Sequence, residues 1–129
     1  MARDARQPEG LTPPGPPYSP VVVAGDLVFT AGQVAFDASG SLIAGGVDEQ
    51  TTQVLDNLER CLAAAGCSMD DVVKVTVFLS DLRDFDTFNR VYARRFVPPY
   101  PARSTVGAQL ADGLLVEIEA VARTSGGGR

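Results

Sequence analysis

The chain of 129 residues contains no histidine and only two cysteines. The missing histidine excludes serine–histidine triads, cysteine–histidine dyads and imidazole as a general base. A zinc site usually takes about four clustered cysteine or histidine ligands, so we expect no metal. Any catalysis must therefore use carboxylates, arginine, tyrosine, hydroxyl groups, backbone groups and water.

The sequence also has no long apolar run and no excess of positive charge. No stretch approaches the roughly 18 apolar residues that cross a bilayer, and the first residues lack the apolar core of a signal peptide. We therefore expect a cytoplasmic protein with no membrane partner, in which Cys61 and Cys67 are free thiols. The net charge of −5 argues against the basic face that phosphate groups require, so we expect no nucleic-acid partner.

Hydrophobic residues make up 45% of the chain, which is enough for one domain with its own core. Residues 1–17 are rich in proline and show little hydrophobic pattern, which predicts a flexible tail. The glycine-rich end, residues 124–129, predicts a second flexible tail. The single domain is therefore expected to span residues 18–123.

Two helices are predicted from apolar residues that recur at helical spacing. The first covers residues 48–66, with Asp48 as its cap and Gly66 at its end. Its apolar stripe consists of Val54, Leu55, Leu58, Leu62 and Ala65. The second covers residues 83–96, ends before a run of prolines, and carries an aromatic stripe made of Phe85, Phe88, Tyr92 and Phe96.

Strands are predicted on both sides of these helices. Residues 20–34 indicate two short strands around a tight turn at residues 24–26. Residues 71–82 alternate in polarity, which predicts that one face carries Val73, Val75, Val77 and Leu79. Residues 103–110 and 114–123 predict an antiparallel pair joined by a turn at residues 112–113, which would bring the last strand within reach of Arg103.

This order of elements predicts an α+β fold, with a mixed sheet and two helices packed on one face. The opposite face of such a sheet would be uncovered. Thr76 and Phe78 on that face are not polar enough for open water, so we expect the chain to self-associate.

Arg103 stands out because three prolines lead up to it and an apolar, β-branched run follows. A guanidinium there either forms an ion pair with Glu117 or Glu119, or binds a ligand's carboxylate with its planar fork. The two glutamates lie two apart on a predicted strand, so they share one face. Either that face is solvated, or one carboxylate is sequestered, has a raised pKa and orients water.

Two further polar residues have open interpretations. Tyr18 lies in an extended segment between prolines, and it is either a turn or core residue or part of a pocket wall. Asn89 is either an exposed helix residue or a polar group beside the aromatic stripe. The glycines form no phosphate-binding motif, so no nucleotide site is indicated.

Five segments in series resemble the Rid family (RidA, or YjgF-type) of reactive intermediate deaminases: PYSP, GDLVFTAGQV, NLERCLAAAGCSMDDVVKVTVFLSDLRDFDTFNRVY, PARSTV and VEIEAVA. The resemblance runs from about Tyr18 to Ala122. It implies a chorismate-mutase-like α+β protomer and a homotrimer with a central β-barrel and pockets at the subunit interfaces. Family members typically hydrolyse enamines and imines such as 2-aminoacrylate to a 2-keto acid and ammonia, without a metal or organic cofactor.

The resemblance also implies roles for individual residues. Arg103 falls on the family's carboxylate-binding arginine, and Glu117 falls on the acidic residue associated with the water. Positions of the substrate pocket fall on Tyr18, Gly32, Ala31, Phe85, Asn89 and Thr105.

The sequence departs from the family pattern at three places. Ala31 stands where a serine or threonine is common, and Thr105 stands where many members have cysteine. The segment from Arg103 to Glu117 is one residue shorter than usual, and a shift within the strand would turn Glu117 to the other face.

The expected function is hydrolytic deamination of a small imine or enamine that bears a carboxylate. The main alternative is a non-catalytic trimer that binds small carboxylates, or a homologue acting on one specialised intermediate. A ribonuclease, an activity attributed to parts of the family, is a third possibility, which the acidic charge and missing histidine disfavour.

Overall fold

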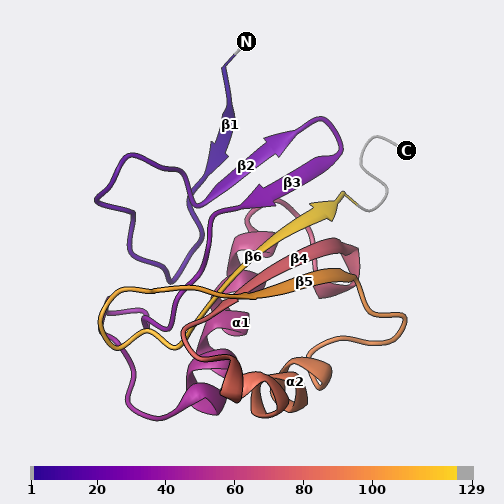
Figure 1. The fold of residues 1–129 in the computed structure, drawn as a ribbon. Coiled ribbons are helices and arrows are strands. Elements are labelled where there is room, and N and C mark those ends of the chain that lie inside the picture. Colours follow the sequence, from indigo (N-terminus) through magenta and orange to yellow (C-terminus); the bar gives the residue numbers. More distant parts are fainter. Residues whose placement is uncertain (1, 125–129) are drawn as a thin grey trace.

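The computed structural model describes residues 2–124 (Figure 1). The described strands form one mixed sheet in the order β1-β2-β3-β6-β4-β5, and helices α1 and α2 pack together on one face of it. The predicted α+β class is therefore confirmed. The helices are α1 (Val47–Ala63) and α2 (Phe85–Ala93), and the strands are β1 (Asp4–Arg6), β2 (Val21–Ala24), β3 (Leu27–Thr30), β4 (Val72–Leu79), β5 (Ala102–Gly107) and β6 (Val116–Arg123).

The core lies between the sheet and the two helices. Its helical part includes the predicted stripe of α1, since Val54, Leu55, Leu58 and Leu62 are all fully buried. The predicted cap is wrong by two positions: the N-cap of α1 is Gly46, and the Gly46 N–H donates to the Glu49 carboxylate at 2.7 Å. Asp48 lies instead within the first turn, where its charge favours the helix dipole.

The alternation predicted for residues 71–82 holds only in part of β4. Val75, Val77 and Leu79 are fully buried against the helices, but Val73 is 48% exposed. A register shift between Val72 and Lys74 explains the difference, because a β-bulge adds one residue and turns the side chains before it to the other face.

The predicted antiparallel pairing of residues 103–110 with residues 114–123 is wrong. Strand β5 pairs with β4, in parallel, and β6 pairs antiparallel with the other edge of β4 and with β3. The physical reason is helix α2, which lies between β4 and β5 in sequence. A strand–helix–strand unit places its two strands parallel and side by side, so β4 lies between β5 and β6.

The N-terminal segment, which the sequence predicts to be a flexible tail, is attached to the domain. Residues 4–6 form the edge strand β1, antiparallel to β2. Arg6 also donates a hydrogen bond to the carbonyl of Ala64, and Arg60 donates one to the carbonyl of Gly10. Strand β1 is exposed along its length, so its residues show no hydrophobic pattern from which the strand could be predicted. The predicted C-terminal tail lies outside the described residues except for Thr124.

The face of the sheet opposite the helices is open. It carries the exposed side chains of Phe29 and Val106 beside the half-buried Thr76 and Phe78. The predicted uncovered, partly apolar face is therefore present. No helix formed by residues 2–124 is long and apolar enough to cross a membrane.

Candidate functional site

Arg103 lies on β5 against helix α2, inside a group of aromatic rings. Its register partner is Val75, which is a core residue, so the Arg103 side chain is on the helix-covered face of the sheet. The guanidinium carbon lies 5.8, 5.4 and 4.8 Å from three ring centroids, those of Phe85, Phe88 and Tyr92. These distances allow cation–π attraction with each ring.

A hydrogen bond to Asn89 orients the guanidinium within these rings. Arg103 Nη2 donates to Asn89 Oδ1 at 2.8 Å. Asn89 and the rings come from one helix, at spacings that place them on neighbouring positions of its surface. We call these five residues, Arg103, Asn89, Phe85, Phe88 and Tyr92, the arginine cradle. Beside it is a hollow of about 280 Å³ that Asn89, Tyr92 and Arg103 help to line.

The arginine cradle contains no negative charge. Arg6, Arg83 and Arg95 each form an ion pair with at least one carboxylate, whereas no ion pair among residues 2–124 involves Arg103. The alternative in which Arg103 binds Glu117 or Glu119 within one chain is therefore not supported. The guanidinium is held in place without being neutralised, and it has donors left for an anion.

Two hydroxyl groups close to Arg103 in space or sequence are buried without a hydrogen-bond partner in the described part of the chain, Tyr92 Oη and Thr105 Oγ1. Burial raises the pKa of Tyr92 to about 12, while the nearby Arg103 acts in the opposite direction. Tyr92 is therefore a neutral phenol at physiological pH. Thr105 lies two residues after Arg103 on β5, so the two side chains share a face.

Glu117 and Glu119 share one face of β6, as predicted. Their register partners on β4 are Phe78 and Thr76, which belong to the open face. Burial, with a smaller contribution from the charge of Glu119, raises the pKa of Glu117. Glu117 is the half-buried member of the pair, and Glu119 is exposed.

Gly32 leaves the space that the Glu117 carboxylate occupies. A Cβ atom at Gly32 would overlap the Glu117 carboxylate oxygen and lie 2.8 Å from Glu117 Cδ. The Glu117 side chain therefore approaches the backbone closely at Gly32. The one-residue shortening between Arg103 and Glu117 leaves Glu117 on the open face together with Glu119.

Tyr18 and Gly32 line one hollow of about 380 Å³ between the N-terminal segment and the residues that follow β3. Tyr18 is 53% exposed, which excludes a core role. The Ala31 N–H donates to the Pro20 carbonyl at 2.9 Å, and this bond fixes the segment of Tyr18 beside the end of β3. We call Tyr18, Gly32 and Glu117 the glutamate corner.

The structure thus brings the candidate residues together in two groups, and not in one. Phe85, Asn89 and Arg103 belong to the arginine cradle, with Thr105 next to it. Tyr18, Gly32 and Glu117 form the glutamate corner, with Ala31 next to it. Arg103 faces the helices and Glu117 faces away from them, so the two groups lie on opposite faces of the sheet within one chain.

Sequence reasoning missed two kinds of residue around these groups. Phe88 and Tyr92 are predicted only as part of an apolar stripe, because their contact with Arg103 spans distant parts of the chain. Gln50 and Asn57 are buried polar residues of α1. Asn57 donates to the carbonyls of Val34 and Phe36. Their position beside the apolar stripe of α1 is the sequence signal that could have predicted their burial.

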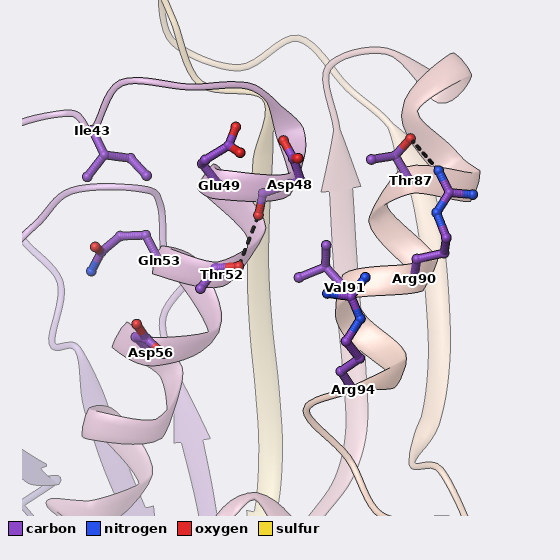
Figure 2. Close-up of a pocket in the computed structure, with 10 residues that line it drawn as sticks. All are labelled: Ile43, Asp48, Glu49, Thr52, Gln53, Asp56, Thr87, Arg90, Val91 and Arg94. Atoms are coloured by element: carbon purple, nitrogen blue, oxygen red, sulfur yellow. Dashed lines mark hydrogen bonds between the residues drawn. The ribbon is translucent and has the colours of Figure 1, made fainter.

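A separate groove of about 560 Å³ runs between α1 and α2 (Figure 2). Its α1 wall carries Asp48, Glu49 and Asp56, and its α2 wall carries Arg90 and Arg94. Several of its side chains bond within their own helix: Thr52 donates to the Asp48 carbonyl and Arg90 donates to Thr87. None of the predicted site residues lines this groove.

Comparison with known proteins places these features in a family. A family model described as Endoribonuclease L-PSP matches residues 11–124. The human protein named 2-iminobutanoate/2-iminopropanoate deaminase is 44% identical over 108 residues, which cover 82% of this chain and 79% of the human one. A RutC family protein of Pyrococcus horikoshii is 44% identical over 116 residues, covering 88% of this chain and 92% of that protein.

Solved structures agree with the fold. RidA from the Antarctic bacterium Psychrobacter sp. superposes with a TM-score of 0.88 at 36% identity, covering 94% of this chain and 99% of that one. Escherichia coli TdcF, solved with bound serine, gives a TM-score of 0.88 at 35% identity over 94% of this chain and 98% of that one. On the match along nearly the whole chain and these structural relatives, the chain belongs to the Rid (YjgF-type) family.

Proposed function

We propose that the protein hydrolyses small imines or enamines that bear a carboxylate, and releases a 2-keto acid and ammonia. The observation that carries this proposal is the arginine cradle, which contains no negative charge. A guanidinium that is oriented by rings and one amide, and that has no protein anion beside it, is ready for the carboxylate of a ligand. The names of the deaminase relatives support the same class of substrate.

In the proposed reaction, Arg103 binds the substrate carboxylate and Glu117 holds the attacking water. Glu117 accepts a proton from the water as its oxygen bonds to the imine carbon, and passes this proton to the imine nitrogen, which gives a tetrahedral carbinolamine. Glu117 then accepts the proton of the new hydroxyl group as the C=O bond forms, and returns it to the departing nitrogen as the C–N bond breaks, so that ammonia leaves. A raised carboxyl pKa suits this two-way proton transfer.

We also propose that the working unit is a homotrimer in which the arginine cradle of one subunit meets the glutamate corner of the next. Two observations support this assembly. The two groups lie on opposite faces of the sheet, so one chain alone does not place Glu117 beside Arg103. The open face keeps apolar side chains exposed, which a partner subunit would cover.

The test measures release of 2-oxobutanoate from 2-iminobutanoate generated in the assay, against the spontaneous rate. Removing a charged clamp that both binds and orients the substrate is expected to lower kcat/KM of Arg103→Ala by about 100-fold or more. Arg103→Lys is expected to recover only part of this loss, since a lysine lacks the planar fork. Wild-type rates in Arg103→Ala would sink the proposal.

The same assay separates the other candidate functions. Ala31 lacks the hydroxyl common in the family, and this residue favours a trimer that binds carboxylates without turnover. Such a protein would bind 2-oxobutanoate saturably, in an Arg103-dependent manner, and would not accelerate hydrolysis. Cleavage of RNA that is lost in Arg103→Ala would instead point to the ribonuclease activity named in the family description.

A further inference from the structure

Tyr92 has a hydroxyl group that its packing does not require. The ring lies against its neighbours in the stripe, 5.5 Å from the Phe88 centroid and 4.7 Å from the Phe96 centroid. Both neighbours are phenylalanines, so packing alone is satisfied by a ring without a hydroxyl. The residue is only 4% exposed. No group among residues 2–124 meets its hydroxyl with full hydrogen-bond geometry, although Arg103 lies near enough to offset part of the rise in the phenol pKa that burial causes, by its charge and by a weak hydrogen bond. A polar group buried in this way lowers the stability of the unliganded protein. Its presence is explained if the hydroxyl forms a hydrogen bond in another state of the protein.

The hydroxyl lies close to the Arg103 guanidinium, which has donors to spare. Of the three rings of the arginine cradle, that of Tyr92 is nearest to the Arg103 guanidinium, at 4.8 Å. The guanidinium is also close enough to influence the ionisation of the phenol. Arg103 makes one side-chain hydrogen bond, to Asn89, in the described chain, although a guanidinium carries five N–H donors.

We propose that Tyr92 is a positioning residue for Arg103: when a carboxylate binds the outer edge of the guanidinium, the Tyr92 hydroxyl oxygen accepts a hydrogen bond from its inner edge. Asn89 and Tyr92 then hold two corners of the guanidinium plane, and the remaining donors point at the carboxylate. This inference rests on the proposed carboxylate-binding role of Arg103. Tyr92 acts through Arg103 and does not itself touch the ligand.

The proposed arrangement explains why Asn89 and Tyr92, the two residues that accept hydrogen bonds from Arg103, are both neutral. A carboxylate at either position would orient the guanidinium equally well, but it would neutralise the charge that attracts the ligand. A phenol and an amide oxygen accept hydrogen bonds without this loss. Because the site is partly buried, the remaining positive charge acts on an anion more strongly than it would in water.

The test compares Tyr92→Phe with the wild-type protein, since this change keeps the ring and removes only the hydroxyl. We expect 2-oxobutanoate to bind about tenfold more weakly, with a similar rise in KM and a change in kcat below twofold, because the lost bond holds the binding group. We also expect the melting temperature of the unliganded variant to equal or exceed that of the wild type. Weaker binding together with undiminished stability is a combination that a purely structural hydroxyl would not give.

Two controls make the result specific. Tyr100→Phe removes the same hydroxyl from a residue that is 51% exposed, and it is expected to change affinity by less than twofold. Binding of 2-oxobutanamide, which lacks the carboxylate, is expected to be equal in Tyr92→Phe and wild type.

Unchanged 2-oxobutanoate affinity in Tyr92→Phe overturns the role of Tyr92 and leaves that of Arg103 intact. Unchanged affinity in Arg103→Ala overturns the proposed function itself. The two variants therefore distinguish failure of this inference from failure of the function on which it rests.

Discussion

Glu117 combines two properties that oppose each other at the scale of a single residue. Its carboxylate fills the space left by Gly32, where partial burial and the charge of Glu119 raise its pKa. A carboxylate that is harder to ionise is a better proton carrier near neutral pH. The same property makes its ionised form a source of instability, as is common for residues at functional sites.

The pH dependence of stability follows from this shift. Below the ordinary carboxyl pKa of 4.5, Glu117 is protonated in both the folded and the unfolded chain and contributes no penalty. As the pH rises through the raised pKa, the folded protein must ionise a half-buried group, and this part of the stability is lost. Glu117→Gln is therefore expected to raise the melting temperature at about pH 7–8 and to change it little near pH 4.

Thermal unfolding of both proteins across this pH range checks the expectation. Glu119→Gln, which removes the same charge from an exposed position of β6, is the matched control, and its gain should be smaller. A Glu117→Gln variant that is less stable than wild type at neutral pH would show that the carboxylate makes favourable contacts that outweigh its burial.

The sequence could propose Arg103 and Glu117 as candidate site residues, because both sit in motifs that resemble those of the Rid family. It could not predict their surroundings. The rings around Arg103 come from a helix 11 to 18 positions earlier, and their orientation depends on how that helix packs on the sheet. A periodic stripe shows that Tyr92 is buried, but it does not show which polar group lies beside its ring.

At the scale of elements, the connection between β5 and β6 is held by one buried side chain. Gln50 of α1 is 2% exposed. Its amide donates to the carbonyl of Gly113 at 2.8 Å and accepts from the N–H of Leu115 at 2.9 Å. These bonds fix the residues just before β6, and thus help to set the register that turns Glu117 to the open face.

Gln50→Ala is expected to lower the free energy of unfolding by about 2–4 kcal/mol, because it leaves two backbone groups without their partner. Urea denaturation measures this loss. Thr52→Ala, at an exposed position of the same helix, removes a hydroxyl that donates to the Asp48 carbonyl, and it is expected to change stability by no more than about 0.5 kcal/mol. Equal effects of the two substitutions would mean that water replaces Gln50 without cost.

The pairing of β5 shows why element types were easier to predict than their arrangement. Hydrophobic periodicity predicts strands over residues 71–82 and 114–123, and it predicts a helix over residues 83–96. A turn signal at Asp112-Gly113 then favours a hairpin, since it is a local feature. The strand–helix–strand rule acts over a longer range of sequence and places β5 beside β4. The local turn signal does not show that this longer-range pairing outweighs a hairpin between β5 and β6.

At the scale of the whole molecule, the position of Arg103 and Glu117 on opposite faces leads to a complementation test. Arg103→Ala and Glu117→Gln are each expected to be inactive alone. When the two variants are refolded together in equal amounts, an intact site forms wherever the Arg103-bearing subunit meets the Glu117-bearing one in the required order. Random mixing makes about a quarter of the interfaces intact, so activity should recover to about a quarter of the wild-type value.

The measurement is the specific activity of the mixture against each variant and against mock-mixed samples that were never unfolded. No recovery, with normal assembly, would mean that both residues of a site come from one chain. Recovery well above a quarter would indicate that the two variants prefer to associate with each other.

The placement of Arg103 and Glu117 on opposite faces of the sheet also makes the proposed activity depend on assembly. If catalysis needs residues from two chains, a dissociated subunit stays folded but has no reaction centre. Activity then depends on protein concentration through the equilibrium between assembled and dissociated subunits. Mild heat or dilution is expected to abolish activity before any chain unfolds. Such a loss is reversible, because reassociation restores every site without a step of refolding.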